Sequence, residues 1–209
     1  MDYLDNIYEA ILDGDMGIVP TNVQSAIDAG IPVSKILIES MIAAMEEVGR
    51  LFQEGEYFVP EMLLAAHSMK AGLSVLQPHL VNTGIEPIGK IILGSVDGDM
   101  HDIGKNLVAM MLEGAGFKIV DLGTDVSAAE FVEAIKEGAD ILGLSALLTT
   151  TLPSMESTIQ AIEIEGLRED IKIIVGGAPV TAEYAHQIGA DGYAKDASQA
   201  VKVAKSFIN

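Results

Sequence analysis

The sequence predicts an N-terminal four-helix bundle followed by an α/β domain with a doubly wound, five-stranded parallel sheet. Residues 1–82 carry apolar side chains at helical spacing. From Lys90 onward, short and almost wholly apolar segments alternate with segments of helical period. This alternation is typical of successive βα units whose sheet is covered on both faces. Between the two regions, residues 83–89 contain Gly and Pro and show no helical stripe, which predicts a linker.

Four helices are expected in the first region. The first begins at Tyr3, the second and weaker one begins near Thr21, and Pro32 and Pro60 suit the first turns of the third and fourth. Glycine-containing segments end the first three of them, at residues 13–15, 30 and 54–56. The last two helices carry apolar stripes at spacings of three and four: Leu37, Met41, Met45, Val48 and Phe52, then Met62, Ala66, Met69, Leu73 and Leu76. Four antiparallel helices with short turns are the simplest way to bury these stripes.

The second region reads as five βα units, which predicts a sheet of the flavodoxin or Rossmann type. The expected strands cover residues 90–96, 117–122, 141–147, 171–175 and 192–194. The expected helices cover residues 103–115, 128–137, 152–165, 182–188 and 197–207. The predicted domains are therefore a helical cap at 1–82, the linker at 83–89 and an α/β domain at 90–209.

Composition excludes several classes of function. The formal net charge is −19, from 12 basic and 31 acidic residues, which argues against binding to nucleic acid or to an anionic membrane surface. The chain has no cysteine, so a bound metal would need nitrogen or oxygen ligands. The first residues lack the pattern of a signal peptide, and no apolar run is long enough to span a bilayer. We expect a soluble, cytoplasmic protein.

Three strand ends carry the residues of chemical interest. Asp99, His101 and Gly104 follow the first predicted strand. Polar and apolar residues that could meet a ligand end or follow the third strand: Ser145, Leu147, Thr149 and Thr151. Gly176 and Gly177 end the fourth, and two adjacent glycines let a bulky ligand approach bare backbone. Because the carboxyl ends of parallel strands share one edge, these loops are expected to enclose a ligand there.

His101 has three possible interpretations. A phosphate-binding loop is disfavoured because the spacing from Gly98 to Gly104 is one residue too long and Asn106 replaces the hydroxyl that holds magnesium. An ordinary hydrogen-bonded loop histidine is the simplest alternative. The third interpretation is a metal ligand whose second ring nitrogen is held by Asp99. The other histidines, at 67, 79 and 186, are remote in sequence, so a single imidazole would suffice only for a metal held inside a macrocycle.

The segments Asp99-x-His101-x-x-Gly104, Ser145-x-Leu147 and Gly176-Gly177 resemble the three-part pattern of the cobalamin-binding domain, in its order and spacing. The helical region resembles the cap of methionine synthase and of the small corrinoid proteins of methyltransferase systems. The resemblance covers essentially the whole chain.

The resemblance implies a site. His101 would replace the cofactor's dimethylbenzimidazole as the lower ligand of cobalt (base-off binding), Asp99 would be its hydrogen-bond partner, and Thr151 would complete a relay. The displaced nucleotide tail would pass residues 145, 147 and 149 and lie against the two glycines. Phe58 and Met62 would shield the upper face of the corrinoid; ordinary bundle core is the equal alternative for these two.

The resemblance also implies a methyl carrier rather than a stand-alone enzyme. Cob(I)alamin would take a methyl group from a substrate:corrinoid methyltransferase, and methylcob(III)alamin would pass it to a second methyltransferase with a folate or thiol acceptor. A reductive activase would rescue oxidised cobalt, and the linker would be the hinge of the cap. The methyl donor would be chosen by the partner enzyme.

Other functions would use the same domain. A cobalamin-dependent sensor would need a DNA-binding segment and, in the known light sensors, a bundle tryptophan, and this chain has no tryptophan. A mutase subunit would need a substrate barrel rather than a helical cap. A flavodoxin-like signalling domain would not place a histidine between the acids of its first loop.

Overall fold

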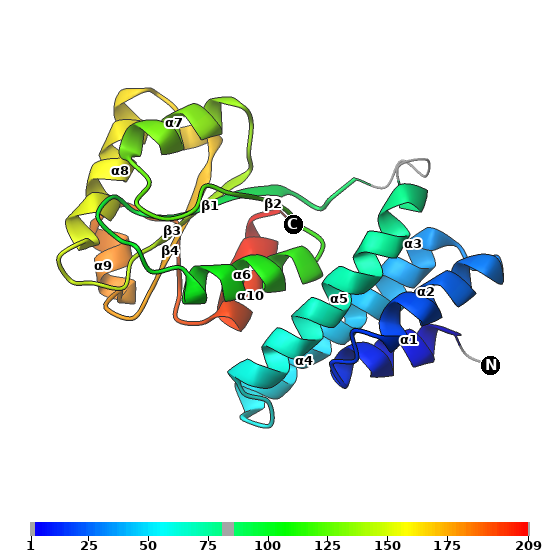
Figure 1. Cartoon of the computed structure of the whole chain (residues 1–209). Helices are drawn as coiled ribbons and strands as arrows, with labels where there is room; N and C mark the ends of the chain where they lie inside the picture. The colour runs from blue at the N-terminus through cyan, green and yellow to red at the C-terminus, as the bar shows by residue number, and fades with distance from the viewer. Residues whose placement is uncertain (1–2, 81–85, 209) are drawn as a thin grey trace. The chain divides into compact units, whose positions relative to one another are not determined.

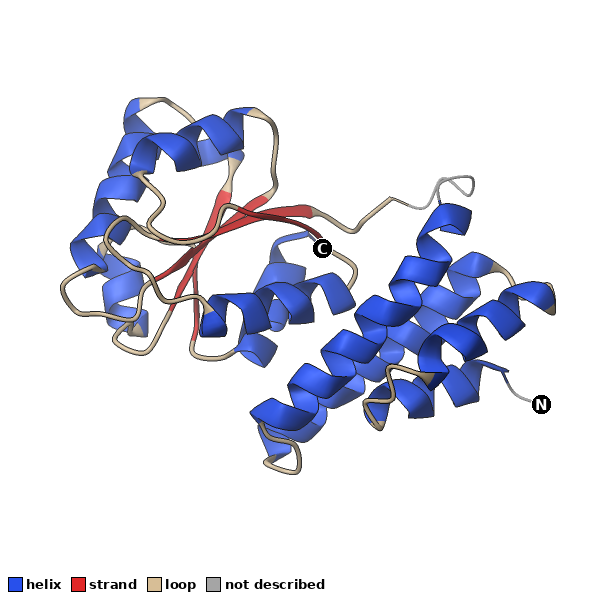
Figure 2. Cartoon of the chain, in the orientation of Figure 1, coloured by secondary structure: helices blue, strands red, loops and turns tan. Residues whose placement is uncertain are grey.

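The computed structural model describes residues 3–80 and 86–208, which form a helical unit and an α/β unit (Figures 1 and 2). The predicted fold class is confirmed for both units. The domain boundaries stay a prediction, and residues 83–85 of the expected linker lie outside the described residues. Among the helices of the described chain, none has the length and apolar character that crossing a membrane requires.

The part of the helical unit that spans residues 3–80 forms four rods. They are α1 (Tyr3–Leu12), α2 (Ile18–Asp28), a continuous third rod made of α3 (Val33–Lys35), η1 (Ile36–Ile42) and α4 (Ala43–Glu54), and α5 (Val59–Leu80). The prediction that α2 starts near Thr21 was wrong by one turn. Oδ1 of Asp15 accepts hydrogen bonds from the backbone N–H groups of Gly17 and Ile18, both at 3.0 Å, and so supports an earlier start.

The middle of the third rod, η1, is a π-helix. Its wider turn changes the phase of the buried face, so that Ile36 and Met41, five residues apart, are both fully buried while Leu37 of the predicted stripe is only partly buried. Gly55 ends the rod in the left-handed conformation, at φ +76°, as the predicted glycine-containing break requires.

The helical unit has a closely packed core. α1 contacts α2, η1, α4 and α5, and α2 also contacts α5. A Cβ atom on Gly72 would lie 2.7 Å from Cγ1 of Val19, so this glycine permits the close approach of α5 to α2. The α5 stripe is confirmed: Met62, Ala66, Met69 and Leu76 are buried and Leu73 is partly buried.

The part of the α/β unit that spans residues 86–208 contains one sheet of five parallel strands. The strands are β1 (Lys90–Ser95), β2 (Lys118–Asp121), β3 (Ile141–Ser145), β4 (Lys172–Gly176) and β5 (Gly192–Ala194), in the order β2-β1-β3-β4-β5. Each predicted strand is present, with ends that differ by at most two residues. The strand order reverses between β1 and β3, and this is where sheets of this order bind ligands.

Helices cover both faces of the sheet (Figure 1). α6 (Ile103–Gly114) and α10 (Ala197–Ile208) lie on one face, and α7 (Ala128–Lys136), α8 (Leu152–Ile164) and α9 (Ala182–Gln187) lie on the other. A short 3-10 turn, η2 (Arg168–Asp170), follows α8 and was not predicted. A core cluster joins β1, β3 and β4 to α7, α8 and α9, with Phe131 and Met155 fully buried within it. This rigid sheet holds the loops at its carboxyl edge.

Candidate functional site

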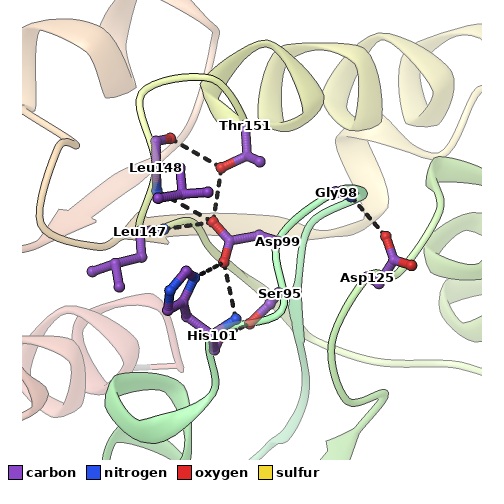
Figure 3. Close-up of polar contacts among 8 residues, drawn as sticks. All are labelled: Ser95, Gly98, Asp99, His101, Asp125, Leu147, Leu148 and Thr151. Atoms are coloured by element: carbon purple, nitrogen blue, oxygen red, sulfur yellow. Dashed lines mark hydrogen bonds and ion pairs between the residues drawn. The ribbon is translucent and has the colours of Figure 1, made fainter.

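The loops that follow β1 and β3 meet at the point where the strand order reverses (Figure 3). Asp99 and His101 lie in the loop between β1 and α6, and Thr151 lies in the loop between β3 and α8. The two loops are joined through one side chain, the carboxylate of Asp99. The structure therefore brings together the predicted acid, the predicted ligand and the predicted hydroxyl.

Asp99 is fully buried, and its two oxygens accept hydrogen bonds from both loops. Oδ1 accepts from the backbone N–H of His101 at 3.0 Å and lies 2.8 Å from Nδ1 of the same residue. Oδ2 accepts from the backbone N–H groups of Leu147 at 2.7 Å and Leu148 at 3.3 Å, and from Oγ1 of Thr151 at 2.7 Å. A buried carboxylate needs such donors to remain charged.

Two opposing effects set the pKa of Asp99. Burial of the carboxylate raises its pKa, but the hydrogen bonds from Thr151, Leu147 and His101 together lower it more. The net result is a pKa well below the usual value for aspartate. The carboxylate is therefore ionised at neutral pH and can only accept hydrogen bonds.

The ring of His101 is held in one tautomer by this carboxylate. Since an ionised carboxylate only accepts, Nδ1 must be the donor in the 2.8 Å contact, and the neutral ring keeps its lone pair on Nε2. The side chain is 49% exposed, so the ring is accessible. Oγ of Ser95 donates to the carbonyl of His101 at 2.6 Å and fixes the backbone of the loop as well. The arrangement presents one oriented nitrogen lone pair.

Thr151 links the acid to the start of α8. Its Oγ1 lies 2.7 Å from Oδ2 of Asp99 and 2.9 Å from the carbonyl oxygen of Leu148 (Figure 3). A hydroxyl has one proton, so it donates to one of these two acceptors at a time. The hydroxyl is thus in hydrogen-bond contact with the predicted acid, and its role in a relay stays a prediction.

The other predicted residues line the same edge in different ways. Ser145 is the last residue of β3 and pairs in register with Ser95 and Gly176. Leu147 and Thr149 are exposed in the loop between β3 and α8. Gly104, early in α6, is exposed, and a Cβ atom built on it would meet nothing within 4 Å.

Gly176 and Gly177 are each required by close contact with neighbouring backbone, which could not be predicted from the sequence. A Cβ atom on Gly177, whose φ is +129°, would lie 1.8 Å from the carbonyl oxygen of Ala146. A Cβ atom on Gly176 would lie 2.8 Å from the carbonyl oxygen of Ala194. The neighbouring backbone of the protein itself excludes a side chain at both positions.

Phe58 and Met62 lie at the start of α5, in the helical unit, and differ in exposure. Phe58 is 64% exposed, and its backbone N–H donates to Oε2 of Glu61 at 2.9 Å. Met62 is fully buried. Exposure makes Phe58 available to a ligand, whereas burial favours the core interpretation for Met62.

Sequence reasoning missed residues near the second strand. Nζ of Lys105 is buried and lies 2.5 Å and 2.6 Å from the carboxylate oxygens of Asp121, at the end of β2. Asp125, in the loop between β2 and α7, bonds to the backbone of Gly98 and Asp99. Asp121 lies near the carboxyl end of the predicted strand 117–122 and Asp125 follows that strand, and this position was the available signal.

In the described ranges, 3–80 and 86–208, no group of three or more His, Asp or Glu side chains is placed to hold a metal ion.

Comparison with protein families gives two matches, both described as a B12 binding domain. One covers residues 89–202 and the other covers residues 3–77. Together they span both units of the chain.

Among curated proteins, a corrinoid protein of Desulfitobacterium hafniense is 42% identical over 212 residues, covering 100% of this chain and 98% of the relative. Dimethylamine corrinoid protein 1 of Methanosarcina acetivorans is 46% identical over 177 residues, covering 84% of this chain and 83% of the relative.

Among solved structures, a cobalamin-binding protein from Desulfitobacterium hafniense superimposes with a TM-score of 0.80 at 34% identity, covering 99% of this chain and 98% of that one. A chain of the methanol:cobalamin methyltransferase complex of Methanosarcina barkeri superimposes with a TM-score of 0.87 at 30% identity, covering 99% of this chain and 80% of that one. Both similarities extend over the whole of this chain rather than over one unit.

Proposed function

Because the chain belongs to the family of corrinoid methyl-carrier proteins of methylamine and methanol methyltransferase systems, we propose that His101 is the lower axial ligand of its corrinoid. The observation that carries this proposal is the 2.8 Å contact between Nδ1 of His101 and Oδ1 of Asp99. It leaves Nε2 with its lone pair on an accessible ring.

The residues at this edge fit a cobalt ion held in a macrocycle. A macrocycle would supply the other nitrogen ligands of the metal, so a single protein nitrogen, that of His101, would suffice. Gly104 leaves open space next to the loop that carries His101, which suits a wide, flat ligand. Leu147 exposes an apolar side chain from the facing loop.

When bound, the corrinoid supplies a cobalt ion that accepts a methyl group from a donor and passes it to an acceptor. Asp99 holds the proton on Nδ1 and thereby strengthens Nε2 as a donor to the metal. Thr151 stabilises the charge of Asp99, and the backbone N–H of Leu147 does the same from the facing loop. These residues would tune His101 as a ligand, while the partner enzymes would supply the catalysis.

Base-off binding leaves the displaced nucleotide tail to be held by the protein. We assign this role to the residues along the end of β3 and β4: Ser145, Leu147, Thr149, Gly176 and Gly177. Their position at one edge of the sheet supports the assignment. Phe58 is our proposal for a side chain that shields the upper face, supported by its exposure, and Met62 would support Phe58 from the interior.

The proposed partners are three. A substrate:corrinoid methyltransferase would load the methyl group, a second methyltransferase would transfer it to a folate or thiol, and a reductive activase would restore oxidised cobalt. The similarity to dimethylamine corrinoid proteins and to a chain of the methanol:cobalamin complex supports methylamines or methanol as the donors. Of these, dimethylamine is the first to test.

Reconstitution tests the proposal. Apoprotein incubated with hydroxocobalamin should bind one corrinoid per chain with a base-off absorbance spectrum, and His101→Ala should lose or alter it. His186→Ala, at an exposed position of α9, is the matched control and should behave as wild type. Methyl transfer is then measured with purified dimethylamine and methanol methyltransferases. A wild-type protein that takes up no corrinoid would refute the proposal.

A further inference from the structure

Asp125 has an unusual backbone conformation. Its φ is +57°, and it is the one non-glycine residue with a positive φ among residues 3–80 and 86–208. Aspartate visits this left-handed region more readily than most residues, but the conformation still carries strain. Such strain persists where surrounding interactions require it, so the contacts of Asp125 need an explanation.

Those contacts all reach the loop that carries His101. The backbone N–H of Asp125 donates to the carbonyl oxygen of Asp99 at 2.9 Å. Oδ1 of Asp125 accepts from the backbone N–H of Gly98 at 2.7 Å (Figure 3). The left-handed backbone allows the main chain and the side chain of one residue to bond to two consecutive residues.

These bonds continue the pairing of β1 with β2 beyond the strands. The backbone N–H of Ser95 donates to the carbonyl of Gly123, and that of Val126 donates to the carbonyl of Ser95, both at 3.0 Å. Val96 and Val126 form an isolated parallel bridge. Asp125 is thus the last link that joins the loop after β2 to the loop after β1.

We propose that Asp125 is a positioning residue for the axial ligand; the inference rests on the proposed function of His101. Gly98, at φ +81°, forms a tight turn in which the N–H of Asp99 donates to the carbonyl of Val96. Asp125 holds this turn from outside at Gly98 and Asp99. By stabilising this turn, Asp125 fixes the carboxylate of Asp99, which orients His101.

Three variants separate the two contributions of Asp125. Asp125→Asn keeps a side-chain oxygen and tolerates the left-handed backbone. The exchange rate of its Gly98 amide should therefore stay within about twofold of the wild-type rate. Asp125→Gly adopts the same backbone more easily but removes the acceptor for the N–H of Gly98. Asp125→Ala removes the acceptor and adds strain, so it should also unfold at a lower temperature than Asp125→Gly.

The first readout uses the apoprotein. Hydrogen exchange at the Gly98 amide, followed by NMR, should be about tenfold faster in Asp125→Gly than in wild type and close to wild type in Asp125→Asn. The second readout uses the protein saturated with Co(II) corrinoid. In protein made with ¹⁵N-labelled histidine, the doublet splitting in its electron paramagnetic resonance spectrum reports the His101 bond. This doublet should be weakened or lost in Asp125→Gly and restored in Asp125→Asn.

The outcomes distinguish this inference from the function on which it rests. Absence of the doublet in the wild type would overturn His101 ligation itself. Full splitting and slow Gly98 exchange in both the wild type and Asp125→Gly would overturn the positioning role alone. A merely structural role would lower the unfolding temperature of the variants without changing the splitting at saturation.

Discussion

The imidazole of His101 donates from Nδ1 to Oδ1 of Asp99 across 2.8 Å, and the accepting carboxylate is fully buried. Because both loops of the site supply donors to Asp99, its charge organises the loops as well as the ring.

Asp99→Asn should destabilise the apoprotein and weaken corrinoid binding. An amide has one acceptor oxygen, and its N–H₂ group would face backbone donors that now bond to a carboxylate. We expect the free energy of unfolding to fall by about 2–4 kcal/mol, measured by urea denaturation. Asp102→Asn, in the exposed part of the same loop, is the control and should change stability by less than about 1 kcal/mol. Equal effects at the two positions would contradict the account.

The stability difference between wild type and Asp99→Asn should depend on pH in one direction. The pKa of Asp99 is raised by burial and lowered further by its hydrogen bonds, so its net position is below the ordinary value. A lowered folded-state pKa gives stability that is present above the unfolded-state pKa of about 3.9 and is lost as the pH falls toward the folded-state value. Urea titrations should therefore show a constant difference from pH 7 to about pH 5 and a shrinking difference below about pH 4. A difference that vanishes near neutral pH would contradict this.

Thr151→Val and Thr151→Ser form a matched pair. Valine keeps the shape but removes the hydroxyl that donates to Oδ2 of Asp99, whereas serine keeps the hydroxyl. We expect valine to lower the free energy of unfolding by about 1–3 kcal/mol and serine to lower it by less. Thermal denaturation of the two variants measures the difference. The hydroxyl has no role if valine is as stable as serine.

Gly104→Ala separates cofactor contact from folding. A methyl group at this position in α6 meets nothing within 4 Å, and alanine favours helix, so the apoprotein should be unchanged or more stable by up to about 1 kcal/mol. Corrinoid affinity, measured by absorbance titration, should still fall about tenfold if the ring lies against this residue. Gly177→Ala is the contrast: its clash with Ala146 should destabilise the apoprotein by more than about 3 kcal/mol. Unchanged affinity in Gly104→Ala would remove that residue from the site.

The Lys105–Asp121 pair gives an asymmetric prediction. Asp121→Ala leaves the buried Nζ of Lys105 without its carboxylate, whereas Lys105→Met replaces the cation by an apolar chain of similar length. We expect the first variant to lose about 2–4 kcal/mol and the second to lose less, measured by urea denaturation. A larger loss in Lys105→Met would show that the ammonium itself is required.

Much of the fold was predictable because its signals are local. The apolar runs of the strands and the spacing of the helical stripes lie within short windows of sequence, and all five strands were found. The π-helical turn at η1 was not predictable, because it depends on how the third rod packs and not on a residue pattern. The early start of α2 depends on Asp15, whose side chain bonds to residues that the apolar period does not include.

In the candidate site too, contacts between residues close in sequence were predictable and contacts between distant residues were not. Asp99 and His101 are two residues apart, so their contact could be expected from the sequence. The bond from Thr151 to Asp99 crosses 52 positions and was expected only through the resemblance to cobalamin-binding domains. Asp125 could not be found from a motif, because its role depends on a left-handed backbone that brings it to a loop 27 positions away.

The most direct test of the central claim is the electron paramagnetic resonance spectrum of Co(II) corrinoid bound to protein made with ¹⁵N-labelled histidine. If Nε2 of His101 binds cobalt, the nitrogen splitting should change from the triplet of ¹⁴N to the doublet of ¹⁵N, and His101→Ala should show neither. A triplet that survives histidine labelling would mean that the cofactor's own base still binds the metal, and the account of this site would be wrong.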